Sequence, residues 1–383
     1  MRPCIVIPGI LGSTLEDVYP LEARNTWGGV STPFTLDNLS LTPDGDVDGL
    51  PTVLIRSREV VSEAYRGIIS GLRGRSPAPV YTFPYDWRLS SRSAGRQLAE
   101  FVRGLLRRKL PGMPADGAGG FDFVCHSMGG LVFRSFLREW GTASPMPVNR
   151  VVFIGTPMLG SLYAVEAMVR GGILFLPSFK AIRKLARTFP GVYELLPRMP
   201  DSFVAGQSAL DIFRVENWQS NVSQPSPKRE DVEQGRLDAA KAVLDGMANP
   251  LDPAFGLQGR VLVIYGDKKE STLRQVPVLP SMFDGADRVK NWFDFDRGTR
   301  ARGDEVVPVD SVYLRGAQYV RIPFDVVSYI NDLKARTLNF HSFLTEVDEV
   351  QTVTARFLQG ESGKDLLPLN LRLISNKVLG TFN

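Results

Sequence analysis

The sequence predicts an α/β fold in which helices cover a mainly parallel sheet, and two features indicate it. Short apolar runs rich in β-branched residues end at Gly, Pro or Asp. Segments with apolar residues at helical spacing separate several of these runs. Active sites in such sheets lie at the carboxyl ends of the strands, so the residues after each run are the candidates for chemistry.

The elements follow one another along the chain in a strand and helix alternation. Strands are expected at 4–9, 78–87, 121–127, 150–157 and 260–267. Helices are expected at 62–74, 93–110 and 129–141. The alternation stops after residue 157, and the chain up to the strand at 260 is typical of helices and loops rich in Leu, Phe, Met and Pro.

Composition excludes several classes of protein. A chain of 383 residues with 43% hydrophobic residues can bury a sizeable core. Its 45 basic and 41 acidic residues are spread along the sequence, so we predict no nucleic-acid partner. Cys4 and Cys125 form no disulfide framework, and no group of Cys and His has metal-ligand spacing, so we predict no metal and no cofactor. No apolar run approaches the roughly 18 residues that span a bilayer.

The stretch "FDFVCHSMGGLVFRSFL" at 121–137 predicts a strand, a tight turn and a helix with Ser127 at the turn. A serine hydroxyl reacts when a base takes its proton and backbone amides receive the oxyanion. Gly129 and Gly130 let the helix approach the strand, and the Met128 amide would point into the oxyanion site. Cys125 stands where the usual G-x-S-x-G motif has its first glycine. The alternative interpretation is a helix N-cap serine after a buried strand.

The sequence has two histidines that could act as the base. His126 directly precedes Ser127, and adjacent residues on a sharp turn point in different directions, so we expect His126 to orient the turn or line the pocket. His341, in "LNFHSFL", occurs where the hydrolase order of serine, acid and histidine places the base. Its alternative interpretation is a surface or helix-start histidine.

Two aspartates follow apolar strands and could orient the histidine. Asp267 lies just past the strand at 260–267, where a simple hydrolase often has its acid. Asp304, in "RGDEVVP", lies on a glycine turn that leads into apolar residues. Position alone leaves both candidates open.

Six motifs occur in an order and spacing that resemble one family. They are "VIPGILGSTLE" near the start, "PYDWRL" (84–89), "HSMGGL", "GTPMLGS" (155–161), "FPGVYELLP" (189–197) and "GDEVVP" (303–308). The chain is similar over residues 4–345 to the lecithin:cholesterol acyltransferase-like family of α/β-hydrolases, which includes enzymes of the lysosomal phospholipase A2 type. The combination of "PYDWR" with "HSMGG" is the most specific part.

The resemblance implies roles for several residues. The family's acid is the Asp of a G-D-x-[TV]-V turn, which corresponds to Asp304, and its base is a late histidine, which corresponds to His341. Asp267 becomes the alternative acid. The Ile10 amide in "PGILGS" would be the second oxyanion donor beside Met128, against the alternative of a plain strand-to-helix turn.

Further residues are candidate substrate or structural contacts. Trp27 in "NTWGG" lies where the family has an aromatic residue near an active-site flap, so it is a candidate substrate or lid contact. An exposed loop tryptophan is the alternative. Leu159 in "GTPMLGS" is a candidate substrate or lid contact as well, as is His126. In "YDWR" we expect Asp86 and Arg88 to form an ion pair that fixes the loop while Trp87 packs, with substrate contact as the alternative.

These observations together predict a single α/β-hydrolase domain over 1–383, with a cap or lid insertion at 160–255 and a smaller insertion at 268–300. Apolar residues at 162–179 are expected to line a cleft or face lipid. The expected reaction is attack of Ser127 on a carboxylic ester of an acyl lipid, as in a phospholipase A or a lipase, with acyl transfer to an alcohol as an extension. The alternatives are an esterase for a non-lipid ester, lactone or polyester, and an inert binding module that retains the fold.

The start of the chain bears on its location. "MRPCIVIPGILGS" has no charged segment followed by an apolar core and a cleavage site. The disulfide cysteines expected in secreted animal members of the family are missing. We therefore expect a cytoplasmic protein, or export by a non-classical route, whose partner is a lipid or ester substrate and whose contact with a lipid surface is peripheral.

Overall fold

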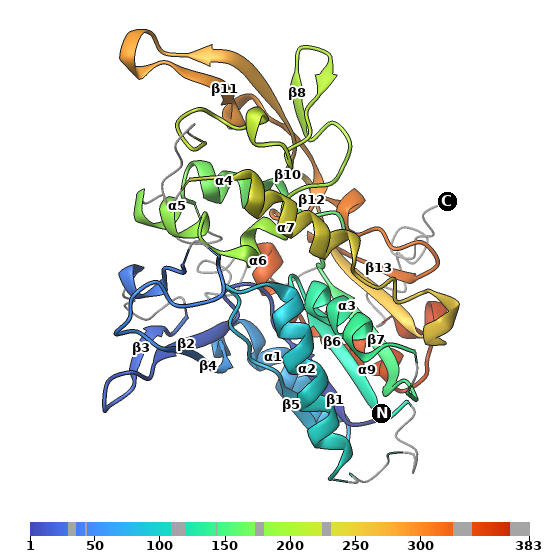
Figure 1. Cartoon of the computed structure of the whole chain (residues 1–383). Helices are drawn as coiled ribbons and strands as arrows, with labels where there is room; N and C mark the ends of the chain where they lie inside the picture. Colours follow the sequence, from blue (N-terminus) through green and yellow to red (C-terminus); the bar gives the residue numbers. More distant parts are fainter. Residues whose placement is uncertain are drawn as a thin grey trace.

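The computed structural model describes residues 1–29, 36–42, 44–108, 110, 113, 119–142, 144–172, 180–223, 231–324 and 339–367. Its centre is a sheet of six parallel strands, which Figure 1 shows with helices on both faces. In spatial order these strands are β5 (Val80–Thr82), β1 (Cys4–Ile7), β6 (Phe121–His126), β7 (Val148–Ile154), β10 (Val261–Met282) and β13 (Gln318–Pro323).

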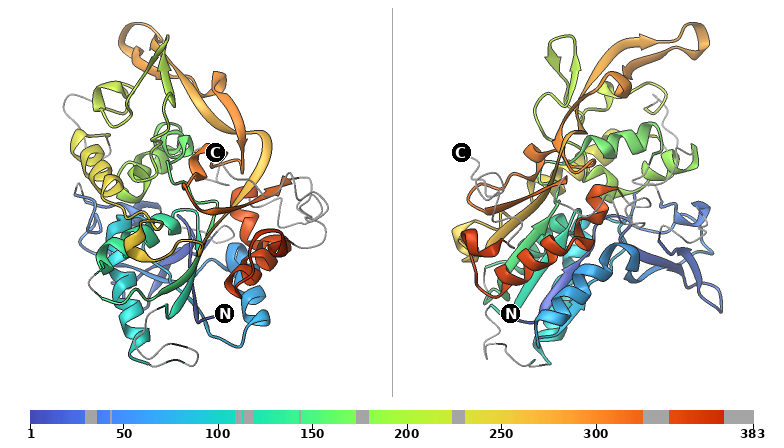
Figure 2. Two further views of the ribbon diagram at one scale, coloured as in Figure 1. Left: turned by 90° about the vertical axis from the view of Figure 1, so that its right-hand side faces the viewer. Right: turned by 180° about the vertical axis from the view of Figure 1, so that it is seen from behind.

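Helices pack on each face of this sheet, as the two views of Figure 2 show. On one face lie α2 (Ser91–Leu106) and α3 (Gly129–Trp140), which pack against each other. On the other face lie α1 (Ser62–Arg75) and α9 (Asp348–Leu358), also in mutual contact. The predicted α/β architecture is confirmed, and the three predicted helices differ from the observed ones only at their ends.

Apolar residues alternate along the central strands between two cores. In β1, Ile5 and Ile7 belong to the core under α2 and α3, whereas Cys4 and Val6 belong to the core under α1 and α9. This alternation follows from the period of two of a strand whose two faces are both covered. The register pairs Ile7 with Cys125, so the two buried cysteines, Cys4 and Cys125, lie at different levels of the sheet.

The strand predicted to end at residue 267 is much longer than expected. β10 continues to Met282 and pairs antiparallel with β11 (Val289–Phe293) and β12 (Thr299–Gly303). The segment at 268–300, predicted as a small insertion, therefore extends the sheet. Its polar composition concealed the strand because, from residue 268 to residue 282, only Thr272, Leu273, Val276 and Val278 are buried.

The segment at 160–255 lies over the carboxyl ends of the parallel strands (Figure 1). It contains the helices expected there, namely α4 (Leu162–Val169), α5 (Lys180–Ala186), α6 (Pro190–Tyr193) and α7 (Gln234–Asp245). It also contains the strands β8 (Phe203–Ala205) and β9 (Ser208–Ala209), which were not predicted, and β8 pairs with β10. Residues 173–179 of the apolar stretch lie outside the described residues.

A second sheet near the start of the chain was also not predicted. It consists of β2 (Ser13–Asp17), β3 (Arg24–Trp27) and β4 (Ile55–Val60) in the order β3–β2–β4. These strands are short and rich in polar residues, so they lack the apolar runs that identify strands in a sequence. Among the described residues, no helix is long and apolar enough to span a bilayer.

Candidate active site

Ser127 occupies a tight turn between β6 and α3. Its φ of 52° lies in the left-handed region, which is uncommon for a residue other than glycine and typical of strained functional turns. A Cβ atom on Gly129 would lie 2.5 Å from the Ile7 carbonyl oxygen, and one on Gly130 would lie 2.3 Å from a methyl group of Thr156. The two glycines therefore permit the close helix approach that the sequence predicted.

The structure brings Ser127, His341 and Asp304 together. His341 Nε2 lies 2.8 Å from Ser127 Oγ, and His341 Nδ1 lies 2.7 Å from Asp304 Oδ2. Nδ1 faces a carboxylate, which only accepts, so Nδ1 carries the proton and Nε2 is free to accept the serine hydroxyl. His341 is carried by α8 (Phe340–Phe343), so a buried chain of three side chains joins residues that are far apart in the sequence.

Backbone amides hold the Asp304 carboxylate in place. Its Oδ1 accepts hydrogen bonds from Val306 N at 3.1 Å and Val307 N at 2.7 Å, which leaves Oδ2 for the histidine. The neighbouring Glu305 accepts a hydrogen bond of 2.9 Å from Phe340 N, directly before His341. The acid loop therefore positions the segment that carries the histidine.

Asp267 has different partners. Its carboxylate is 2% exposed and lies 2.6 Å from Arg302 Nη2 and 2.6 Å from Arg321 Nη1. These ion pairs join β10 to β12 and β13. The structure thus places Asp304 against His341, whereas the buried Asp267 carboxylate forms ion pairs with two arginines.

The two predicted oxyanion donors belong to segments that adjoin Ser127. Ile10 follows β1, and the preceding Gly9 passes so close that a Cβ on it would lie 2.7 Å from Ser127 Cβ. Met128 follows Ser127 directly. Neither the Ile10 nor the Met128 amide donates a hydrogen bond to another described residue, so both can receive a negatively charged oxygen.

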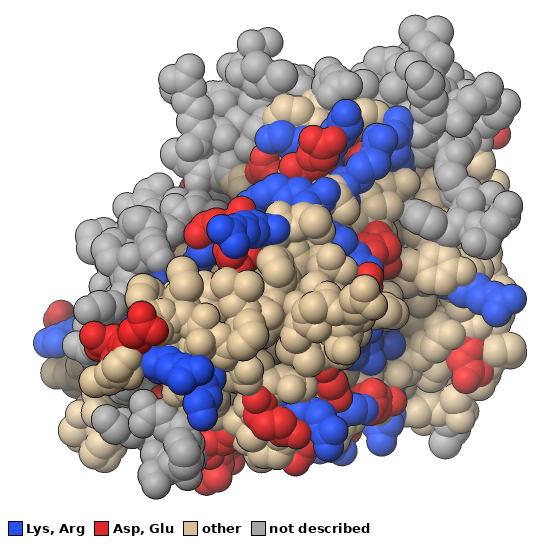
Figure 3. Space-filling model, turned by 90° about the horizontal axis from the view of Figure 1, so that it is seen from above, with Lys and Arg blue, Asp and Glu red and all other residues tan. Residues whose placement is uncertain are grey.

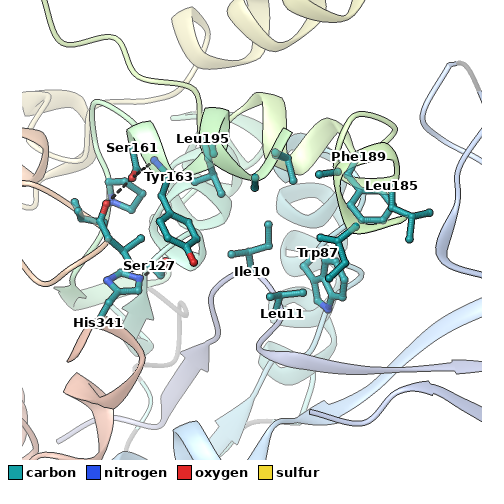
Figure 4. A pocket seen from close by; sticks show the side chains of 18 of the residues that line it. Ile10, Leu11, Trp87, Ser127, Ser161, Tyr163, Leu185, Phe189, Leu195 and His341 are labelled. Carbon is teal, nitrogen blue, oxygen red and sulfur yellow. Dashed lines mark hydrogen bonds between the residues drawn. The ribbon is translucent and has the colours of Figure 1, made fainter. Parts of the chain in front are cut away.

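An apolar cavity opens beside Ser127 and His341, which lie at one end of it in Figure 4. Ile10 and Leu11 come from the loop after β1, whereas Leu185 and Phe189 come from the segment at 160–255 and lie at the other end. Such a lining, with polar groups concentrated at one end, is typical of sites for ligands with a long apolar part. The other lining residues are Trp27, Leu39, Trp87, Pro157, Ser161, Tyr163, Ala164, Ala167, Ile182, Ala186, Val192, Leu195, Val306 and Val307.

Residues 72–232 match the family model described as lecithin:cholesterol acyltransferase. The predicted resemblance to this family is confirmed. The lecithin:cholesterol acyltransferase match includes the Ser127 turn and ends before Asp304 and His341. It supports acyl ester hydrolase or acyltransferase activity in general.

Solved structures resemble the fold, whereas the comparison with curated proteins gives no match. The crystal structure of the Tle4-Tli4 complex contains a chain that is 14% identical with a TM-score of 0.59, and the similarity covers 98% of both chains. This likeness shows a shared α/β-hydrolase fold. The mature Bacillus licheniformis lipase BlEst2 is 12% identical with a TM-score of 0.37, over 84% of this chain and 83% of that one.

Trp27 lies inside the protein beside the cavity that contains Ser127 and His341. It is on β3, is 2% exposed and donates a hydrogen bond of 2.9 Å from Nε1 to the Leu11 carbonyl. The alternative of an exposed loop tryptophan is therefore wrong, and its ring lines the cavity. Leu159 does not line this cavity; its amide lies 3.1 Å from the Ser311 carbonyl.

The "YDWR" motif contains an ion pair, and its tryptophan lines the cavity. Arg88 Nη2 lies 2.6 Å from Asp86 Oδ2, which confirms the predicted ion pair, and 2.8 Å from Asp48 Oδ1. Trp87 donates a hydrogen bond of 3.0 Å from Nε1 to the Ser13 carbonyl and also lines the cavity. Asp48 had no signal in the sequence, because its partner is 40 residues away.

His126 is buried beside the turn and does not line the cavity. Its Nδ1 lies 2.8 Å from the Tyr65 hydroxyl, and its Nε2 lies 3.1 Å from the His341 carbonyl oxygen. His126 was expected to orient the turn or line the pocket; it is absent from the lining of this cavity, and its ring contacts α1 and the backbone of His341. Tyr65 was not predicted, since a tyrosine on an amphipathic helix is ordinarily part of the core.

Proposed function

We propose that this protein is a serine hydrolase that cleaves carboxylic esters of acyl lipids through an acyl-enzyme on Ser127. The observation that carries the proposal is the buried hydrogen-bonded chain from Ser127 through His341 to Asp304 at the end of an apolar cavity. The family match over residues 72–232 supports the same class of reaction.

The reaction follows from the geometry of these groups. Ser127 Oγ attacks the ester carbonyl while His341 Nε2 takes its proton, and Asp304 stabilises the imidazolium that forms. The Ile10 and Met128 amides donate hydrogen bonds to the oxyanion. His341 then protonates the leaving alcohol, and water or an acceptor alcohol releases the acyl group by the reverse steps.

The shape of the site favours an acyl lipid over a small ester. Apart from Ser127 and His341, most side chains that line the cavity are aliphatic or aromatic, and several come from the segment at 160–255. Apolar walls favour a bound acyl chain in proportion to the surface removed from water. We assign this segment as the cap of the predicted hydrolase domain.

We also propose that the protein meets lipid from its surface through an apolar patch on the small sheet. The patch consists of Val18, Tyr19 and Leu21 after β2 together with Leu54 before β4, and each is exposed. The Val18 amide donates a hydrogen bond of 2.8 Å to the Leu54 carbonyl, so the two segments are adjacent. The same sheet carries Trp27, which lines the cavity.

A fluorophosphonate probe tests the serine mechanism. The wild-type protein should be labelled, and Ser127→Ala should not be, whereas Ser70→Ala, which changes an exposed serine of α1, should be labelled like the wild type. Equal labelling of Ser127→Ala would contradict the mechanism.

A panel of p-nitrophenyl esters of increasing chain length tests the substrate class. We expect kcat/KM to rise with chain length. A preference for the shortest ester would favour a non-lipid substrate instead. Mass spectrometry of products from a mixed lipid extract, with and without an added alcohol, separates hydrolysis from acyl transfer.

A further inference from the structure

Four buried polar groups form a hydrogen-bond chain beside Ser127. The Gly9 amide donates a hydrogen bond of 2.8 Å to the Tyr65 hydroxyl, which lies 2.8 Å from His126 Nδ1. On the other side of the ring, His126 Nε2 lies 3.1 Å from the His341 carbonyl oxygen. The chain therefore runs from the loop that carries Ile10 to the backbone of the candidate base.

The proton positions in this chain follow from its ends. A carbonyl oxygen only accepts, so His126 Nε2 must carry a proton. In a neutral ring Nδ1 is then the acceptor, and the Tyr65 hydroxyl must donate to it. The tyrosine oxygen is left to accept from Gly9 N, so every donor in the chain has one acceptor.

The burial of the two side chains keeps them neutral. Burial, with the neighbouring His341 as the second cause, lowers the pKa of His126 to about 3. Burial raises the pKa of the Tyr65 hydroxyl well above its ordinary value. A protonated His126 would donate from Nδ1 as well as from Nε2, and the Tyr65 oxygen that faces Nδ1 already accepts from the Gly9 amide. It would also place a positive charge beside His341, because the centroids of the two rings are 5.0 Å apart.

We propose that Tyr65 and His126 are positioning residues. Through this hydrogen-bond chain they hold the loop that carries Ile10 and the segment that carries His341 at a fixed distance from each other. The role rests on the proposed function of Ser127 and His341. The bridge connects the loop that carries Ile10 with the segment that carries His341. It therefore fixes the positions of the oxyanion donor and of the base relative to Ser127. Small displacements of such groups reduce rates strongly, so a rigid bridge favours catalysis.

Nitrogen NMR tests the proton order directly. The protein has two histidines, so a sample with ¹⁵N-labelled histidine rings gives signals from only two imidazoles. The His126→Gln variant assigns these signals, because it lacks one of them. We expect His126 to remain neutral with its proton on Nε2 from about pH 5 to about pH 9. A proton on Nδ1, or titration of His126 within this range, would overturn the proposed chain.

The Tyr65→Phe variant tests the bridge while it keeps the ring packing. It should shift the His126 Nδ1 resonance, and it should lower kcat by about 10-fold to 100-fold with KM within about twofold. Tyr81→Phe is the matched control, because the Tyr81 hydroxyl makes no hydrogen bond to a described residue. An unchanged kcat in a Tyr65→Phe protein with wild-type melting temperature would overturn the positioning role.

A pair of variants at His126 separates hydrogen bonding from packing. His126→Gln retains one donor and one acceptor, so it should keep more of kcat than His126→Leu, which has neither. Equal losses in the two variants would contradict the role of the hydrogen bonds. If the wild-type protein cleaves no ester, the proposed function fails and the positioning role with it, whereas the NMR result still decides the chain itself.

Discussion

Asp304 and Asp267 illustrate how the environment of a residue decides its role. Asp267 follows an apolar segment of the sequence and Asp304 precedes one, and each is buried. Asp304 has one oxygen held by backbone amides and the other directed at His341. Asp267 has both oxygens engaged by arginines. A carboxylate neutralised by two cations is a structural group, whereas one that faces a single imidazole can orient a base.

Replacing each aspartate by asparagine should therefore have different effects. Asp304→Asn should lower kcat by about 10³-fold to 10⁴-fold, because the histidine loses the carboxylate that fixes its tautomer. Asp267→Asn should lower the melting temperature, since it leaves Arg302 and Arg321 without their buried partner, and retain much of kcat. Steady-state kinetics and thermal unfolding of both variants provide the measurement. The reverse pattern would make Asp267 the acid.

Asp122 predicts a pH dependence of stability. Burial raises the pKa of its carboxyl from 3.8 to about 6. Because the folded protein favours the neutral form, stability from this group is fully present below pH 3.8 and is lost as the pH rises through about 6. The loss is on the order of 3 kcal/mol.

The Asp122→Asn variant should lack this dependence. Asparagine is neutral at every pH, so wild-type stability should decline relative to the variant between about pH 4 and pH 6 and then run parallel. Asp122 also accepts hydrogen bonds from Arg2 N and Asn149 Nδ2, and their loss adds a cost that does not change with pH. Melting temperatures of both proteins across this range give the comparison, and parallel curves throughout would contradict it.

At the scale of elements, α2 carries two glycines in contrasting surroundings. A Cβ on Gly95 would lie 2.7 Å from Ser135 Cβ and 2.8 Å from Phe136 N, because α2 and α3 pack closely there. On Gly104, the nearest atom would be Arg107 Nη2 at 3.8 Å. The first glycine permits helix packing, and the second has no such constraint.

Substitution by alanine at these positions should change stability in opposite directions. Gly95→Ala should destabilise by about 1–3 kcal/mol through overpacking against α3. Gly104→Ala should stabilise by about 0.4–1 kcal/mol, because alanine restricts the unfolded chain and favours the helix. Urea unfolding of the two variants measures both effects. A stabilising Gly95→Ala would show that α2 and α3 can move apart at no cost.

The elements that could be predicted are those with a local signal. The turn at Ser127 was predictable because strand, glycines and helix are contiguous, and the central strands because both of their faces are buried. β2, β3 and β4 could not be predicted, because they are short and rich in polar residues and therefore lack an apolar run. The second half of β10 was concealed because it is also mostly polar.

At the scale of the whole molecule, charge and apolar surface are distributed differently. On the face seen in Figure 3, basic side chains lie beside acidic ones, with no large block of one sign. Attraction of this face to an anionic surface is therefore weak, and contact with lipid depends on apolar residues. The exposed patch on the small sheet supplies them, and Figure 1 shows this sheet projecting from the main one.

Leu21→Asp tests this contact. Leu21 is fully exposed, so the change should leave folding and the hydrolysis of a soluble ester unaltered. Binding to phosphatidylcholine vesicles should weaken by about tenfold or more, because a leucine side chain no longer enters the lipid. Phe283→Asp, at the tip of the β10–β11 hairpin and also exposed, is the control and should bind normally. Co-sedimentation with vesicles measures both, and equal weakening would contradict a specific role for the patch.

The sequence by itself determined the α/β architecture, the position of Ser127 and the choice of His341. The first two rest on local patterns, and the third rests on the fact that the protein has only two histidines. The tertiary structure decided which aspartate faces His341, where Trp27 points and what His126 does. These outcomes depend on segments that approach one another only when strands align at the edge of the sheet. Tyr65 is the clearest case, since only folding brings its hydroxyl between Gly9 and His126.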